Sequence, residues 1–222
     1  MTLNKYIDHT KLGPTVTKEE IIKLCEEARK YDFMSVCVDP IYVSLAKKQL
    51  ENSGVLVCTV VGFPHGTSTT KIKFLETEEA ILAGADEIDM VINQNALKNK
   101  DYDYLLKETQ TVKSAVGDKT LKVILETSNL SKEEIVKACL IAKEARADFV
   151  KTSTGFSRGG ATVEDVSLMR ETVKTDLGVK ASGGIRTYED AQAMIEAGAN
   201  RIGASQGINI VTKKTTNDEK SY

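Results

Sequence analysis

Several charged side chains lie inside short segments of this sequence that are otherwise apolar. In residues 86–92, alternate positions form one apolar face, and Asp89 falls on the opposite face together with Glu87. The same alternation places one lysine on the inner face of each of three later segments: Lys122 in 121–126, Lys151 in 148–152 and Lys180 in 179–182. An unpaired ammonium group is costly to bury, so these residues form either a set of ion pairs or a reactive site.

A reactive site would use a lysine amine to form an imine with a carbonyl compound. At the ordinary lysine pKa of about 10.4, only about 0.04% of the amine is neutral at pH 7. Burial and a neighbouring ammonium both favour the neutral, nucleophilic form. The pair Lys151 and Lys180 therefore predicts an imine-forming enzyme, and either lysine could be the nucleophile. The alternative is structural, with the lysines paired to Asp89, Glu87 and Glu126 in a stabilising network.

The elements that position these residues alternate along the whole chain. Eight short apolar segments are expected to be strands: 6–10, 34–38, 55–61, 86–92, 121–126, 148–152, 179–182 and 201–204. Amphipathic segments with helical spacing follow them: 18–31, 41–52, 69–83, 102–116, 132–146, 163–175, 188–197 and a short one from about 206. This pattern predicts an α/β fold, a single (β/α)8 TIM barrel over residues 1–212, with a polar C-terminal tail over 213–222. An open doubly wound sheet fits less well, because the sequence has neither a G-x-G-x-x-G nor a Walker A motif.

Local signals support these boundaries. Capping boxes are expected at Thr17–Glu20 and Ser131–Glu134, with weaker versions at Thr162–Asp165 and Thr187–Asp190. Asp39 is expected to cap a helix that begins at Pro40. Glycines are expected to end five helices: Gly54, Gly84, Gly117, Gly178 and Gly198.

Glycine-containing turns follow the last two expected strands, at 180–186 and 202–207. Glycine lets a backbone approach an anion, and barrel enzymes frequently bind phosphate at the loops after strands 7 and 8. A third such turn, at 152–156, follows the strand that carries Lys151. These turns predict a small phosphorylated carbonyl compound as the ligand.

Composition excludes several other classes of protein. The 222 residues hold 30 Lys and Arg against 32 Asp and Glu, so no overall basic charge favours nucleic acid. The sequence predicts no membrane span and no signal peptide, and the four cysteines are expected to be free thiols in the cytoplasm. With only two histidines, a zinc site of the His-rich type is not expected.

Eight segments of the chain resemble the deoxyribose-phosphate aldolases, a family of class I aldolases with a (β/α)8 fold. They run nearly from end to end: IDHTKL, VCVDP, VVGFPHG, ADEIDMVIN, LKVILET, ADFVKTSTGF, VKASGGIRTYEDA and RIGAS. The resemblance implies a lyase that cleaves 2-deoxy-D-ribose 5-phosphate reversibly to D-glyceraldehyde 3-phosphate and acetaldehyde, without a metal or other cofactor. It also implies a homodimer or homotetramer that works in the cytoplasm, in deoxyribose phosphate catabolism.

The resemblance further implies a role for individual residues. Lys151 would form the Schiff base, Lys180 would perturb its pKa, and Asp89 would belong to the proton relay. Lys122 and Asp8 match positions that support the relay, and a C-terminal tyrosine such as Tyr222 folds into the site of some relatives as a proton shuttle. The substrate and phosphate contacts would be Cys37, Thr154, Gly155, Gly183, Gly184, Gly203, Ala204 and Ser205.

Two positions depart from the family pattern. Phe156 stands where some relatives carry a lysine, and Gln206 replaces a serine or small residue. Phosphate binding is therefore expected to depend more on backbone amides, Ser205 and a helix dipole. Two other functions stay open from the residues: another imine-forming barrel aldolase that acts on a ketose phosphate, and a sugar-phosphate-binding barrel without turnover.

Overall fold

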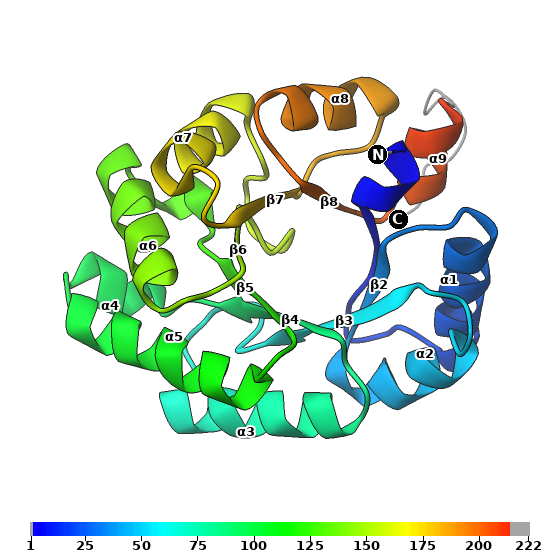
Figure 1. Ribbon diagram of the computed structural model, residues 1–222, viewed down its shortest axis with the longest axis horizontal. Helices are drawn as coiled ribbons and strands as arrows, with labels where there is room; N and C mark the ends of the chain where they lie inside the picture. Colours follow the sequence, from blue (N-terminus) through cyan, green and yellow to red (C-terminus); the bar gives the residue numbers. More distant parts are fainter. Residues whose placement is uncertain (1, 214–222) are drawn as a thin grey trace.

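Eight parallel strands close into a barrel in the computed structural model, which describes residues 2–213 (Figure 1). The strands are β1 Ile7–Lys11, β2 Ser35–Val38, β3 Leu56–Val61, β4 Glu87–Val91, β5 Thr120–Ile124, β6 Phe149–Lys151, β7 Gly178–Ser182 and β8 Arg201–Ala204. Each strand pairs with the next along the chain, and β8 pairs with β1 through Asp8 and Gly203. The predicted (β/α)8 barrel is confirmed.

Helices cover the outside of the barrel, with one after each strand in chain order and two, α4 and α5, after β4 (Figure 1). They are α1 Lys18–Lys30, α2 Val43–Gln49, α3 Thr70–Leu82, α4 Gln94–Lys98, α5 Tyr102–Val116, α6 Lys132–Glu144, α7 Val163–Val173, α8 Tyr188–Glu196 and α9 Gly207–Thr212. The described residues also hold 3₁₀ turns: η1 Leu3–Tyr6 precedes β1, η2 Pro40–Tyr42 precedes α2, and η3 Thr127–Asn129 precedes α6. The five-residue α4 is not predicted from the sequence, because it is too short to show a helical period; Asn93 caps it by accepting from Ala96 N.

The two faces of each strand separate apolar from polar residues as the alternation predicts. On β4, Ile88 and Met90 are fully buried in the main hydrophobic core between strands and helices. On β5, Leu121 and Val123 belong to the same core. The intervening positions point into the barrel, which places charged side chains in the interior of a fold whose walls are otherwise apolar.

Most helix caps follow the sequence. The capping boxes at Thr17, Ser131 and Thr187 form, whereas Thr162 only accepts from Asp165 N. Glycines with positive φ follow α3, α5 and α8 as expected, but Gly54 is an exception, because α2 already ends at Gln49. Asp39 caps no helix; its side chain accepts from Gly13 N at 3.0 Å, and Pro40 opens the 3₁₀ turn η2 instead.

Gly178 is a further exception, because it opens β7 and does not end a helix. Helix α7 ends at Val173, and Lys174 provides the residue with positive φ. A Cβ at Gly178 would lie 2.1 Å from the Phe149 ring, so this glycine makes room for an interior aromatic side chain.

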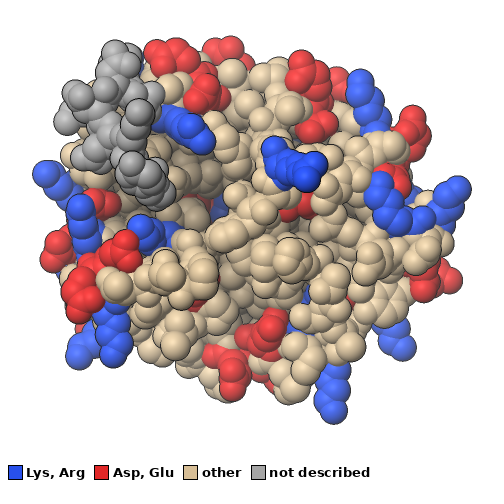
Figure 2. All heavy atoms as spheres, turned by 180° about the vertical axis from the view of Figure 1, so that it is seen from behind, with Lys and Arg blue, Asp and Glu red and all other residues tan. Residues whose placement is uncertain are grey.

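The charged surface contains both signs interspersed around the rim of one face, with a mostly uncharged middle (Figure 2). Among the described residues, no helix is both long and apolar enough to cross a membrane. The expected polar tail at 213–222 lies almost wholly outside the described residues, so the boundary at residue 212 stays a prediction. Helix α9 ends at Thr212.

Candidate active site

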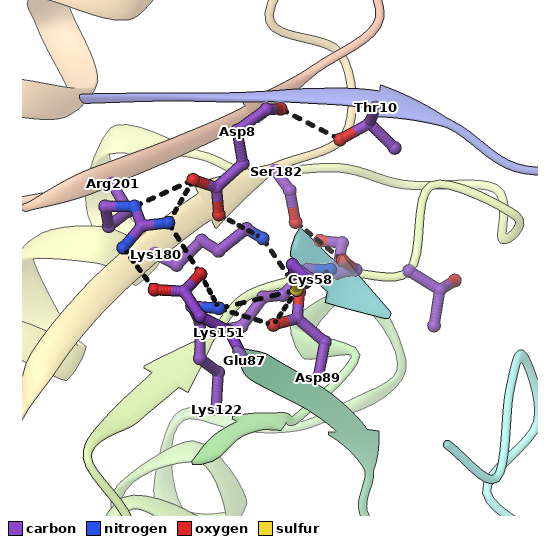
Figure 3. Close-up of polar contacts among 12 residues, drawn as sticks. Asp8, Thr10, Cys58, Glu87, Asp89, Lys122, Lys151, Lys180, Ser182 and Arg201 are labelled. Atoms are coloured by element: carbon purple, nitrogen blue, oxygen red, sulfur yellow. Dashed lines mark hydrogen bonds and ion pairs between the residues drawn. The ribbon is translucent and has the colours of Figure 1, made fainter. Parts of the chain in front are cut away.

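The carboxylate of Asp89 lies at the centre of the cluster that the sequence predicts (Figure 3). Lys151 and Lys180 each donate to its Oδ2 atom at 2.7 Å, and Lys122 donates to its Oδ1 atom at 2.9 Å. The four side chains come from β4, β5, β6 and β7, and all are buried. The structure thus brings together the three lysines and the aspartate that strand alternation selects.

Lys180 contacts two carboxylates, because Asp8 Oδ2 is 2.6 Å and Asp89 Oδ2 is 2.7 Å from its Nζ. Burial by itself would lower the pKa of Lys180, but Asp8 and Asp89 outweigh burial and hold that pKa well above its ordinary value. Lys180 is therefore a permanent cation in this site. Among residues 2–213, Lys151 pairs with one carboxylate, that of Asp89, and its side chain is 4% exposed against 0% for Lys180.

Asp89 stays ionised although it is completely buried. Burial would raise its pKa, but Lys122, Lys151 and Lys180 together hold the pKa well below its usual range. A carboxylate in this state is a weak base and a strong hydrogen-bond acceptor, and it contacts both candidate nucleophiles directly.

Lys122 and Arg201 form further ion pairs next to Asp89 and Lys180. Lys122 donates to Glu87 Oε2 at 2.7 Å as well as to Asp89. Arg201 of β8 donates to both Glu87 oxygens, at 2.9 and 2.7 Å, and contacts Asp8 through Nε and Nη2. Lys122 thus contacts Asp89 directly, and its role in support of the proton relay stays a prediction.

Arg201 is not among the predicted site residues, although the strand pattern contains a signal for it. Arg201 and Gly203 alternate with Ile202 in the short segment 201–204, and this spacing puts the arginine on the inner face. Glu87 was selected only as a partner for the lysines, and it does pair with Lys122.

Glu126 differs from its expected place as a partner for the interior lysines. Strand β5 ends at Ile124, and Glu126 takes a left-handed conformation with φ of 58°. Its carboxylate accepts from Thr154 Oγ1 at 2.5 Å, from Thr154 N at 3.2 Å and from Ser157 Oγ at 2.9 Å. Glu126 therefore holds the loop after β6, which contains two of the expected substrate contacts, Thr154 and Gly155.

Two cysteines lie at the wall of the site, although they are far apart in sequence. Cys37 on β2 and Cys58 on β3 are register partners, and both are buried free thiols. Cys58 donates to Asp89 Oδ1 at 3.1 Å (Figure 3). Burial raises the pKa of the Cys58 thiol well above its ordinary value, which keeps the donated proton on sulfur.

The glycine turns expected to bind phosphate lie side by side at the ends of β6 and β7. Ala161 N donates to the carbonyl oxygens of Ser182 and Gly183, at 3.1 and 3.0 Å, and so joins the two loops. Gly183 and Gly184 both have positive φ, 85° and 82°, which only glycine adopts without strain.

The remaining expected contacts lie at the end of β8 and on the β6 loop. Ala204 is buried at the end of β8, whereas Ser205, beyond the strand, is exposed, as is Gly155 on the β6 loop. Gln206 accepts from Asn209 Nδ2 at 2.8 Å, within the first turn of α9. Phe156 is 51% exposed and packs edge-on against Phe63, with the two ring centroids 5.2 Å apart.

The absence of a side chain at Gly203 leaves space for Lys180 and Ser182. A Cβ at this position would lie 3.1 Å from Lys180 Cε and 3.0 Å from Ser182 Cβ. The absent side chain gives Lys180 room to reach both carboxylates. Tyr222, the expected proton shuttle, lies outside the described residues.

The structure is a (β/α)8 barrel in which buried lysines surround one interior carboxylate, and glycine-containing turns follow β6, β7 and β8. This combination is typical of a barrel enzyme of the aldolase class. Residues 2–213 match the model of the DeoC/LacD family aldolases, and the chain belongs to this family.

Individual relatives agree with this assignment. The chain is 62% identical over 212 residues to a deoxyribose-phosphate aldolase of Clostridium novyi, across 95% of this chain and 96% of the relative. A second such relative, from Macrococcus caseolyticus, is 60% identical over 211 residues, with 95% and 96% covered.

Solved structures extend the likeness to the fold. The crystal structure of a putative deoxyribose-phosphate aldolase from Coccidioides immitis has a TM-score of 0.92 at 46% identity and covers 95% of this chain and 84% of its own. The deoxyribose phosphate aldolase from Aeropyrum pernix, described as a tetramer, has a TM-score of 0.86 at 32% identity, with 95% and 89% covered.

Proposed function

We propose that this chain is a class I aldolase that cleaves 2-deoxy-D-ribose 5-phosphate reversibly to D-glyceraldehyde 3-phosphate and acetaldehyde. Its membership of the aldolase family and its deoxyribose-phosphate aldolase relatives support the substrate and the reaction. The contact of Lys151 and Lys180 with one oxygen of Asp89 is the structural observation that carries the chemistry.

Lys151 is the nucleophile in this proposal. Both lysines contact Asp89, but Lys180 is also held by Asp8, so Lys180 is the better stabilised cation. Asp89 can relay the proton that Lys151 must lose without retaining it, because its pKa is low, and Lys180 keeps a positive charge beside the amine. This difference supports an assignment that the residue pattern alone leaves open.

The reaction then follows from a cationic imine. The Lys151 nitrogen attacks the C1 aldehyde of the open-chain sugar, and loss of water gives a protonated imine. A base removes the proton of the C3 hydroxyl, the C2–C3 bond breaks, and its electron pair enters the imine to give an enamine. D-glyceraldehyde 3-phosphate leaves, C2 takes up a proton, and hydrolysis frees acetaldehyde and Lys151. We assign the proton transfers to Asp89. Lys122 supports it by donating to its carboxylate, and Asp8 supports it through the ion pair with Lys180.

The substrate phosphate is assigned to the turns that follow β6, β7 and β8. Thr154, Gly155, Gly183, Gly184, Gly203, Ala204 and Ser205 are the proposed contacts, with Cys37 at the wall near the reacting carbons. Because Phe156 replaces a cationic side chain, backbone N–H groups and the Ser205 hydroxyl supply the anion contacts in this proposal.

A coupled assay tests the activity. Purified protein supplied with 2-deoxy-D-ribose 5-phosphate should release D-glyceraldehyde 3-phosphate, and a chelator should leave the rate unchanged because the imine polarises the substrate. Cleavage of fructose phosphates instead would favour a transaldolase-like enzyme. No product from either substrate would favour a non-catalytic binding barrel.

Two finer expectations accompany this function. We infer a homodimer or homotetramer, supported by the tetrameric structure of the Aeropyrum relative, and light scattering of the purified chain tests it. We retain Tyr222 as a candidate proton shuttle; its deletion should slow turnover, and an unchanged rate would remove it from the mechanism.

A further inference from the structure

Three metal-binding atoms lie together at the wall of the active site. The Sγ atoms of Cys37 and Cys58 and a carboxylate oxygen of Asp89 are all within 4.8 Å of one another, and all three residues are buried. The register of β2 against β3 places the two cysteines opposite each other, and the Cys58 thiol donates to Asp89 Oδ1 at 3.1 Å. The catalytic scheme makes no use of the Cys58 sulfur.

We propose that Cys37, Cys58 and Asp89 form a binding site for a thiophilic divalent cation such as Zn²⁺ or Cd²⁺, and that the bound cation inhibits the enzyme. Thiolate sulfur selects such cations, and carboxylate oxygen is a common third donor. Donor atoms around a tetrahedral Zn²⁺ with these ligands are about 3.5–3.8 Å apart. In the structure, Cys58 Sγ is 3.1 Å from Asp89 Oδ1, and all three donor atoms lie within 4.8 Å of one another. Small side-chain movements therefore suffice to bring the three atoms to the spacing that Zn²⁺ needs.

The neighbouring ammonium groups do not prevent binding, because the exchange conserves charge. Lys122 Nζ lies 3.5 Å from Cys58 Sγ, and Lys151 and Lys180 occupy the other oxygen of Asp89. A divalent cation that binds two thiolates displaces two thiol protons, so the net charge of the cluster stays the same. The cation takes the place of the Cys58 proton between sulfur and Oδ1, and three protein donors leave the fourth position for water.

Inhibition rests on the proposed function, because it requires Asp89 to be needed for proton transfer. A cation on Oδ1 adds a positive charge to the group that must accept protons, and so opposes that transfer. Leu12 and Phe63, both half-buried, pack against Cys37 and Cys58 apart from the main core, so the cluster lies one side chain below the surface.

Binding is tested first, independently of activity. Tag-free protein is dialysed against Zn²⁺ and its metal content measured, and Co²⁺ is added to a second sample as a spectroscopic probe. Wild type should hold one tightly bound Zn²⁺ per chain and show a thiolate-to-cobalt charge-transfer band. Cys58→Ala and Cys58→Ser should lose both signals, whereas Cys139→Ala, which removes a buried cysteine on α6 outside the cluster, should retain them. Equal binding by the Cys58 and Cys139 variants would overturn the site.

Inhibition is tested next, with each variant compared with its own rate in the absence of zinc. Zn²⁺ should inhibit wild type and Cys139→Ala, a chelator should restore the rate, and Cys58→Ala should need at least a tenfold higher Zn²⁺ concentration for the same fractional loss. Binding without inhibition would contradict the inhibitory role while leaving the site intact. A protein that binds Zn²⁺ at Cys58 yet never turns over would contradict the proposed function and not the metal site.

Discussion

At the scale of residues, the site depends on a single carboxylate that four donors share. Asp89 receives Lys122 and Cys58 on Oδ1, and Lys151 and Lys180 on Oδ2. Every favourable direction around its two oxygens is therefore used, and a substrate that reacts with Lys151 must change this arrangement. The coupling between amine and carboxylate is direct, without an intervening side chain.

Replacement of Asp89 by asparagine should abolish most of the activity. Asparagine keeps the shape but cannot accept the lysine proton, so kcat should fall by about 10²–10⁴-fold in the coupled assay. Asp103→Asn, at an exposed position on α5, is the matched control and should retain the wild-type rate. A modest change in kcat for Asp89→Asn would place the proton relay elsewhere.

Replacement of Lys180 by methionine should slow imine formation more than substrate binding. Lys151 would then be the only ammonium on Asp89 Oδ2 and would hold its proton more tightly, so the activity that remains should shift to higher pH. A pH–rate profile measures this, with Lys107→Met, an exposed position on α5, as the control. An unshifted profile with a normal rate would reassign Lys180 to a structural role.

At the scale of elements, strand alternation predicts the site because the interior is the one place where charged residues of several strands must meet. Asp89, Lys122, Lys151 and Lys180 were all found in this way. Glu126 was misplaced because a left-handed residue ends the alternation beyond Ile124, and the sequence holds no glycine or proline there to signal it. The pairing of Cys37 with Cys58 could not be predicted, because it depends on the register of β2 against β3.

The missing side chain at Gly203 on β8 should be necessary for Lys180 on β7. The Cβ of Gly203→Ala would press on Lys180 Cε and Ser182 Cβ, which belong to the packed barrel wall. We expect a loss of about 1–3 kcal/mol in the free energy of unfolding and at least a tenfold lower kcat. Urea unfolding and the coupled assay measure the two effects. A variant with unchanged stability and rate would show that Lys180 and Ser182 can move to accommodate the added methyl group.

At the scale of the whole molecule, ion pairs close the barrel across its interior. Arg201 of β8 joins Asp8 of β1 and Glu87 of β4, and Lys180 of β7 joins the same Asp8. These contacts connect the first and last strands with the opposite wall. The barrel topology could be predicted from the eight-fold alternation of strands and helices. The ion-pair partner of each charged residue could not, because it depends on the stagger of the strands in the closed sheet.

Asp8 should give this closure a specific dependence on pH. Burial would raise the pKa of Asp8, but Arg201 and Lys180 hold it well below its ordinary value of about 3.9. The folded state therefore binds the proton more weakly than the unfolded state, and the stabilisation is complete above the unfolded pKa and lost as pH falls through the folded pKa.

We expect Asp8→Asn to lower the free energy of unfolding by about 3–5 kcal/mol at pH 7, because it leaves buried cations short of a partner. The difference from wild type should be the same at pH 5 and should shrink at pH 3. Urea titrations at the three pH values measure it. A difference that grows in acid would contradict the direction of the Asp8 shift.

The covalent intermediate on Lys151 is the central claim, and trapping it is the most direct measurement. Borohydride is added to the protein with acetaldehyde, and peptides are mapped by mass spectrometry, with Lys151→Leu as the control. The account predicts a two-carbon ethyl adduct on Lys151 and a variant that folds but neither labels nor turns over. A reduced adduct on Lys180 or another residue, with Lys151 unmodified, would contradict it.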